Sequence, residues 1–84
     1  MNIAFGPEKD AINLEKHGVS LALARQFDWL TALVQPAKTV GGETRWKLLV
    51  VFEGIAYAVI FTRRADVFWI ISLRRVSRKE RRAL

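Results

Sequence analysis

A cluster of arginine and lysine residues near the C-terminal end of the chain is the feature that most suggests chemistry. Eight of the fourteen Lys and Arg residues lie from Arg63 onward, where Asp66 and Glu80 are the only acidic residues, and the formal net charge is +6. Phosphate backbones commonly bind such surfaces, and the guanidinium fork matches phosphate oxygens. The sequence therefore predicts a protein that binds a polyanion. Clustered charge is also typical of a simple solvated face.

Cleavage of RNA is the reaction that these residues suit best. The RNA supplies its own nucleophile, the 2′-hydroxyl. The protein then needs only a base, an acid and cations that offset the charge developing on the phosphorane. The sequence contains no Gly-rich phosphate loop, no Ser-His-Asp order and no carboxylate-rich metal cluster, which argues against most other enzyme classes.

Two side chains are candidates for moving protons. Histidine titrates near neutrality, and His17 is the only histidine. It stands at the end of a predicted helix, where the alternative role is an interaction with the last carbonyls. Glu43 lies two residues before Arg45, where its carboxylate either accepts a proton or forms an ion pair with that arginine.

Arginines at the ends of two predicted strands complete the candidate site. We expect Arg63 at one strand end to converge with Arg74 and Arg75 at another on one edge of the sheet. Trp46 is either a core aromatic or a platform for base stacking, and burial favours the core. Trp69, in the middle of a strand, is expected in the core or against a partner chain.

Periodicity and turn residues predict the elements that hold these side chains. Two helices at residues 7–16 and 20–28 form a hairpin, and a brief edge strand at 33–35 ends at Pro36 before a flexible loop at 39–42. Three strands at 44–52, 55–62 and 67–73 form an antiparallel meander. A basic helix at 78–84 begins with a capping box of Ser77 and Glu80. We therefore expect an α+β fold, in which an N-terminal helical hairpin packs on a small antiparallel sheet of three to four strands, with a short basic C-terminal helix.

Composition limits the remaining possibilities. The 84 residues allow one domain, residues 1–84. The absence of cysteine and the single histidine argue against a disulfide framework and a zinc site, so we expect no metal and no cofactor. The longest apolar stretch, residues 48–61, is too short to span a bilayer. We expect a soluble cytoplasmic protein of bacterial type, with no membrane association.

Several motifs resemble those of the BrnT family of type II toxin-antitoxin ribonucleases, which are similar in fold to the RelE toxins. Residues 7–19 read Pro-x-Lys-x-x-x-Asn-x-x-Lys-His-Gly-Val, and a Glu-x-Arg-Trp element follows at residues 43–46. A Thr-x-Arg strand end is matched loosely at residues 61–63, and Ile-Ile-Ser-x-Arg is matched at residues 70–74. The chain departs from the family pattern at Phe5-Gly6, at Ala22-Leu23 and at Trp69.

The resemblance implies a toxin that cleaves RNA without metal and inhibits translation. Its partner would be an antitoxin with a ribbon-helix-helix type DNA-binding domain, and the complex would repress its own operon through operator DNA. The matched positions for the active surface are Glu43, Arg45, Arg63 and Arg74, with His17 in addition. RNA contacts are expected from Lys16, Lys47, Arg64, Arg75 and Arg78.

Two other functions fit the same residues. A non-catalytic module would hold nucleic acid or acidic antitoxin segments on the same basic face, and a ribosome-associated protein would bind rRNA without toxicity. An antitoxin could cover the basic face or add a strand to the sheet edge. A neighbouring open reading frame for a small acidic or DNA-binding protein is expected.

Overall fold

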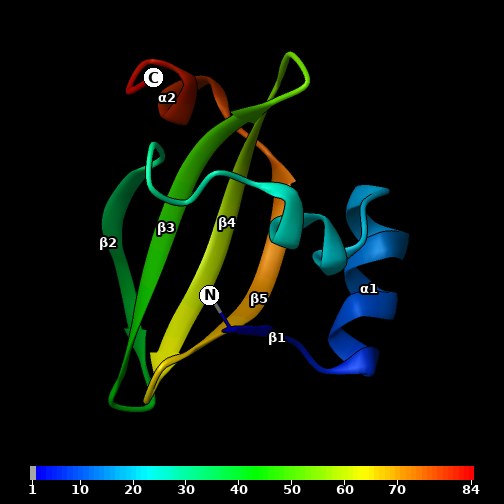
Figure 1. The fold of residues 1–84 in the computed structure, drawn as a ribbon, viewed down its shortest axis with the longest axis vertical. Helices are drawn as coiled ribbons and strands as arrows, with labels where there is room; N and C mark the ends of the chain where they lie inside the picture. The colour runs from blue at the N-terminus through cyan, green and yellow to red at the C-terminus, as the bar shows by residue number, and fades with distance from the viewer. Residues whose placement is uncertain (1) are drawn as a thin grey trace.

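A five-stranded mixed sheet is the frame of the molecule in the computed structural model, which describes residues 2–84 (Figure 1). The strand order is β1-β5-β4-β3-β2, and β2 to β5 pair antiparallel in succession. The strands are β1 (Asn2–Ala4), β2 (Leu33–Val40), β3 (Glu43–Phe52), β4 (Ile55–Arg64) and β5 (Val67–Arg75). The helices are α1 (Pro7–His17), the 3₁₀-helix η1 (Leu21–Gln26) and α2 (Arg78–Arg81). The α+β class and the β3-β4-β5 meander are confirmed.

The predicted N-terminal arrangement is wrong. The described chain begins with β1, which pairs in parallel with β5, so the sheet has five strands instead of three or four. Three residues are too few to show a strand period, and the partner strand is remote in the sequence. The two helices do not form a hairpin that covers the sheet. The short η1 lies over one face, whereas α1 stands beside the β5 edge (Figure 1).

The hydrophobic core lies between η1 and one face of the sheet, here called the helix face. Leu21 and Ala24 of η1 and the following Phe27 are buried there. On the sheet, the buried members of this cluster are Leu48, Val50, Tyr57, Val59, Phe61, Ile70 and Leu73. Side chains alternate between faces along a strand, so the intervening residues point to the opposite face, here called the basic face.

The side chain of Asn13 joins α1 to the sheet. This residue is only 4% exposed. Its amide nitrogen donates to the carbonyl of Leu73 (2.7 Å) and to that of Val19 (2.9 Å), and its oxygen accepts from the Leu73 N–H (3.1 Å). The amide therefore satisfies both polar backbone groups of one β5 residue, as a neighbouring strand would.

Strand β2 is longer than predicted. It continues through Pro36 to Val40, because edge strands and bulges accommodate proline, and its register with β3 shifts between Pro36 and Thr39. The predicted loop at 39–42 is reduced to a tight turn. Gly41 and Gly42 both have positive φ (58° and 77°), as a two-residue hairpin turn requires, and this turn fixes the start of β3.

The C-terminal segment begins as predicted and ends early. Ser77 caps α2, its hydroxyl accepts from the Glu80 N–H, and the Glu80 side chain accepts from the Ser77 N–H, so the capping box is confirmed. The helix covers only Arg78–Arg81 instead of residues 78–84. Within the described residues, no helix combines the length and hydropathy needed to cross a membrane.

Candidate functional site

Four cationic side chains belong to the basic face and come from three neighbouring strands. Arg45 and Lys47 alternate with core residues on β3, Arg64 follows the same alternation on β4, and Arg74 follows buried Leu73 on β5. Two carboxylates accompany these cations: Glu43 at the start of β3 and Glu80 from α2. The meander thus brings together residues that are far apart in the sequence.

Lys47, Arg74 and Glu80 form a three-residue ion-pair network at one end of the basic face. The Glu80 carboxylate accepts from both terminal nitrogens of Arg74 (2.7 and 3.0 Å) and lies 2.7 Å from Nζ of Lys47. Its side chain is 7% exposed. The hydrogen bonds from Arg74, then those from Lys47 and the Ser77 N–H, hold the pKa of Glu80 well below its usual range and outweigh the effect of burial. The α2 carboxylate therefore stays ionised and neutralises cations on this face.

The stability that Glu80 contributes should depend on pH. We expect Glu80→Gln to lower the free energy of unfolding at pH 7 by about 1–3 kcal/mol, because hydrogen bonds between charged partners are lost. The folded-state pKa of Glu80 is depressed, so this contribution is present above the unfolded pKa of about 4.3 and is lost as the pH falls towards the folded value. Urea unfolding at pH 7, 5 and 3 measures it. The exposed Glu15→Gln is the control, and a wild-type advantage as large at pH 3 as at pH 7 would contradict the prediction.

Glu43 and Arg64 form the second ion pair of the basic face. Nε of Arg64 donates to one carboxylate oxygen of Glu43 (2.8 Å) and its Nη2 donates to the other (3.1 Å). The Arg64 hydrogen bond is the main reason why the pKa of Glu43 is lowered, and the same bond raises the pKa of Arg64. Arg64 is 58% exposed, so the pair contributes little to stability and is easily rearranged by a bound anion.

Arg45 lies between the two ion-paired groups. It follows Glu43 and precedes Lys47 at two-residue spacing on β3, so the three side chains share one face. Its Nε is buried and has no hydrogen-bond partner among residues 2–84. A buried N–H without a partner is costly and needs an explanation, and an anionic ligand on this face would provide one.

An aromatic ring adjoins the same cations. The Arg64 guanidinium carbon lies 5.5 Å from the centroid of the Trp69 ring. Trp69 is half-buried and pairs across the sheet with Thr62, on the basic face, and does not belong to the core cluster. Trp46, in contrast, packs against that core, as expected. A flat aromatic ring beside a guanidinium group is suited to stacking against an RNA base.

Three of the predicted arginines do not join this group. Arg63 lies on the helix face, where its guanidinium carbon is 5.8 Å from the Phe68 ring centroid and its Nε donates to the Ala65 carbonyl. Arg75 is exposed and pairs with core-facing Tyr57, which places it on the helix face too. The expected convergence of Arg63, Arg74 and Arg75 is therefore wrong, because consecutive strand residues point to opposite faces. Arg78 is exposed on α2.

His17 and Lys16 lie at the end of α1, away from the ion pairs of the basic face. They line a shallow hollow together with Ile71 and Ser72 of β5. Among the described residues, no hydrogen bond or ion pair connects either side chain to Glu43 or Arg45. The proton-transfer hypothesis for His17 receives no geometric support.

Residues 5–80 match the sequence model of a family described as the ribonuclease toxin, BrnT, of type II toxin-antitoxin systems. The chain belongs to the BrnT family. The chain is similar to the crystal structure of the Brucella abortus ribonuclease toxin, BrnT, with a TM-score of 0.77 and 33% sequence identity. The match covers 93% of this chain and 99% of that chain. No curated protein sequence matches the chain.

Membership of the BrnT family confirms the resemblance found in the motifs and makes an antitoxin the expected partner class. Two residues gain a role that the motifs did not assign. Asn13 of the Pro-x-Lys-x-x-x-Asn pattern joins α1 to β5, and Glu80 joins α2 to Lys47 and Arg74. A buried asparagine could have been suspected from a polar residue inside an amphipathic helix. The sequence gives no comparable indication of which cations Glu80 meets.

Proposed function

We propose that this BrnT-family chain is an endoribonuclease toxin that cleaves RNA on its basic face without a bound metal ion and so inhibits translation. The observation that carries the proposal is Arg45, with a buried and unpartnered Nε between two ion-paired groups. A phosphate group bound at Arg45 would meet its guanidinium and the neighbouring cations, and a turn of the side chain would bring the buried Nε–H to the phosphate. The proposal includes neutralisation by an antitoxin with a ribbon-helix-helix type DNA-binding domain, which would also bring operator DNA into the complex.

In the proposed reaction Arg45 holds the scissile phosphate and Glu43 accepts the proton of the 2′-hydroxyl. The 2′-oxygen then forms a bond to phosphorus, the bond to the 5′-oxygen breaks, and the leaving oxygen takes a proton from the ammonium group of Lys47. Negative charge builds up on the phosphorane oxygens, where the fixed guanidinium groups stabilise it. The phosphate competes with Glu43 for Arg64, which frees the carboxylate to act as a base.

Replacing Glu43 tests the proposed base. We expect Glu43→Gln to lower single-turnover cleavage of a labelled RNA by about 10²–10⁴-fold, the usual contribution of general base catalysis. RNA affinity should be unchanged or tighter, because the substitution removes a negative charge beside the phosphate. Gel-based cleavage assays and filter binding measure the two quantities separately.

The matched control for this experiment is Glu15→Gln, which removes an exposed carboxylate from α1 and leaves the net charge identical to that of the test variant. Equal cleavage rates for the Glu43 and Glu15 variants would exclude Glu43 as the base. Loss of RNA affinity in parallel with cleavage would instead point to a role in binding.

A non-catalytic binding module remains the second candidate. One observation favours it: Glu43 is tied to Arg64 and has a lowered pKa, which makes it a weaker base in the free protein. Such a module would bind RNA with a strong salt dependence and would leave it intact. Purified wild-type protein incubated with RNA separates the two candidates, since only the nuclease yields fragments.

A further inference from the structure

An aromatic groove opens on the helix face, on the opposite side of the sheet from the basic face. It has a volume of about 360 Å³. Its walls come from five segments of the chain and consist of Trp29, Val34, Trp46, Phe61, Arg63 and Phe68. The groove lies where η1 no longer covers the sheet, and none of the proposed catalytic residues lines it.

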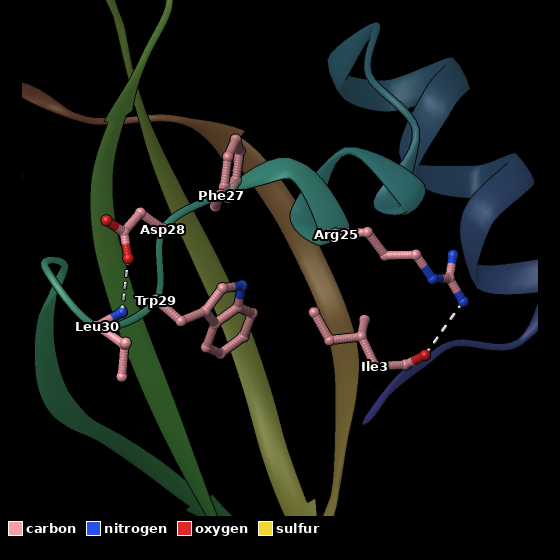
Figure 2. Close-up of a pocket in the computed structure, with 6 residues that line it drawn as sticks. All are labelled: Ile3, Arg25, Phe27, Asp28, Trp29 and Leu30. Carbon is pink, nitrogen blue, oxygen red and sulfur yellow. Dashed lines mark hydrogen bonds between the residues drawn. The ribbon is translucent and has the colours of Figure 1, made fainter. Parts of the chain in front are cut away.

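The groove is preformed. Nε1 of Trp29 donates to the carbonyl of Ala24 (2.9 Å), which fixes the indole. The ring meets Phe61 edge-on with centroids 4.9 Å apart and Phe68 in a tilted contact at 5.4 Å. Figure 2 shows the Trp29 ring lying against the sheet below Phe27. A rigid aromatic wall loses little conformational entropy on binding.

The rim of the groove exposes apolar side chains to solvent. Val34 of the edge strand β2 is 45% exposed, and Leu30, next to Trp29, is 93% exposed. Exposed apolar side chains gathered beside an aromatic groove are typical of a protein-binding surface.

The chemistry of the lining favours an apolar side chain that belongs to an acidic segment. Arg63 is the only charged residue of the six, and it takes part in no ion pair among residues 2–84. A nucleobase would bury several polar edge atoms against walls that offer few partners, which is costly. An aliphatic or aromatic side chain has no such penalty, and a carboxylate beside it would meet Arg63.

We propose that this groove is the anchor site for the antitoxin, and that it takes an apolar side chain from an acidic segment of that protein. The proposal rests on the proposed function, because it assumes the toxin-antitoxin pair. Arg63 and Arg64 are consecutive on β4 and point to opposite faces, so the anchor and the RNA site lie on different sides of one sheet. The antitoxin can thus be bound at the groove while another part of it passes the β2 edge towards the basic face.

Variants of exposed residues test the anchor without disturbing the core. Val34→Gln places a polar amide in the groove wall, and Arg63→Glu reverses its charge. The control is Val40→Gln, since Val40 lies on the same strand, is 44% exposed, and pairs with Glu43 at the far end of β2. The probe is the purified full-length antitoxin that we expect a neighbouring gene to encode, titrated by calorimetry into each folded variant.

We expect Kd for the antitoxin to rise at least tenfold for Val34→Gln and further for Arg63→Glu, with Val40→Gln within twofold of the wild type. RNA cleavage by Val34→Gln without antitoxin should equal that of the wild type. An unchanged Kd for both groove variants would overturn the anchor. Slower RNA cleavage by Val34→Gln at an unchanged Kd would also overturn the anchor, because the groove would then be an RNA subsite. Self-association of the wild type that Val34→Gln abolishes would overturn it too.

The same titration distinguishes the two proposals. If the wild type binds the antitoxin but does not cleave RNA, the nuclease proposal fails and the Kd values still decide where the antitoxin binds. If the wild type cleaves RNA and the groove variants bind the antitoxin normally, the anchor fails alone.

Discussion

Replacing Arg45 with glutamine is expected to lower the rate of RNA cleavage by about 10²–10³-fold, the cost of removing one preorganised donor to a developing oxyanion. The guanidinium stands between the Glu43–Arg64 pair and the Lys47–Glu80 pair, and its Nε is the buried donor without a partner. Glutamine removes the charge and this donor together. Single-turnover cleavage of a labelled RNA measures the effect.

Two further variants make the Arg45 result specific. Arg82→Gln removes the same charge from an exposed position just after α2 and should change the rate by no more than about threefold, as expected for a remote phosphate contact. Arg45→Lys keeps the charge but lacks the fork, so we expect an intermediate rate. Equal losses in Arg45→Gln and Arg82→Gln would mean that net charge alone accounts for the activity.

Stability provides an independent check on the same residue. A buried donor without a partner destabilises the folded state, so Arg45→Gln should unfold at the same or a higher urea concentration than the wild type. If Arg45→Gln is inactive but at least as stable as the wild type, Arg45 is retained for binding its ligand and not for stability. A clear fall in stability would instead assign Arg45 to the fold.

The elements that the sequence predicted well are those specified by local chemistry. Gly18 closes α1 with a φ of 73°, and the capping box of Ser77 and Glu80 starts α2. Runs of β-branched and aromatic residues located β3, β4 and β5. Strand β1 was missed because its three residues are held by a parallel partner remote in sequence, and Pro36 was read as a strand end although edge strands tolerate it.

The candidate site was predicted as a set of residue types, and the sheet decided which members meet. Alternation along β4 sends Arg63 to the helix face and Arg64 to Glu43. A bulge shifts the register of β5 between the partners of Ile60 and Phe61, so that Ile70 and Leu73 both reach the core and Arg74 faces Glu80. Counting alternate positions from the sequence cannot place residues beyond an unseen bulge.

Substituting Asn13 by alanine should lower the free energy of unfolding more than Glu80→Gln or Arg45→Gln does. The change removes three hydrogen bonds and leaves the N–H and carbonyl of Leu73 without partners in a buried setting. Each buried unpaired group costs about 1–3 kcal/mol, so we expect the free energy of unfolding to fall by about 2–4 kcal/mol. In an 84-residue domain this corresponds to a decrease in Tm of roughly 10–20 °C.

Two further variants show whether the hydrogen bonds of the Asn13 amide cause the loss of stability. Asn13→Asp keeps an acceptor for the Leu73 N–H but loses the donor to two carbonyls, and its carboxylate would face the Leu73 oxygen, so it should be at least as unstable as alanine at pH 7. Gln26→Ala removes an exposed amide and should change stability by less than about 0.5 kcal/mol. Thermal and urea unfolding followed by circular dichroism measure all three. If Asn13→Ala unfolded like Gln26→Ala, the Asn13 amide would not be what holds α1 against β5, and the packing of η1 on the helix face would have to position the first helix instead.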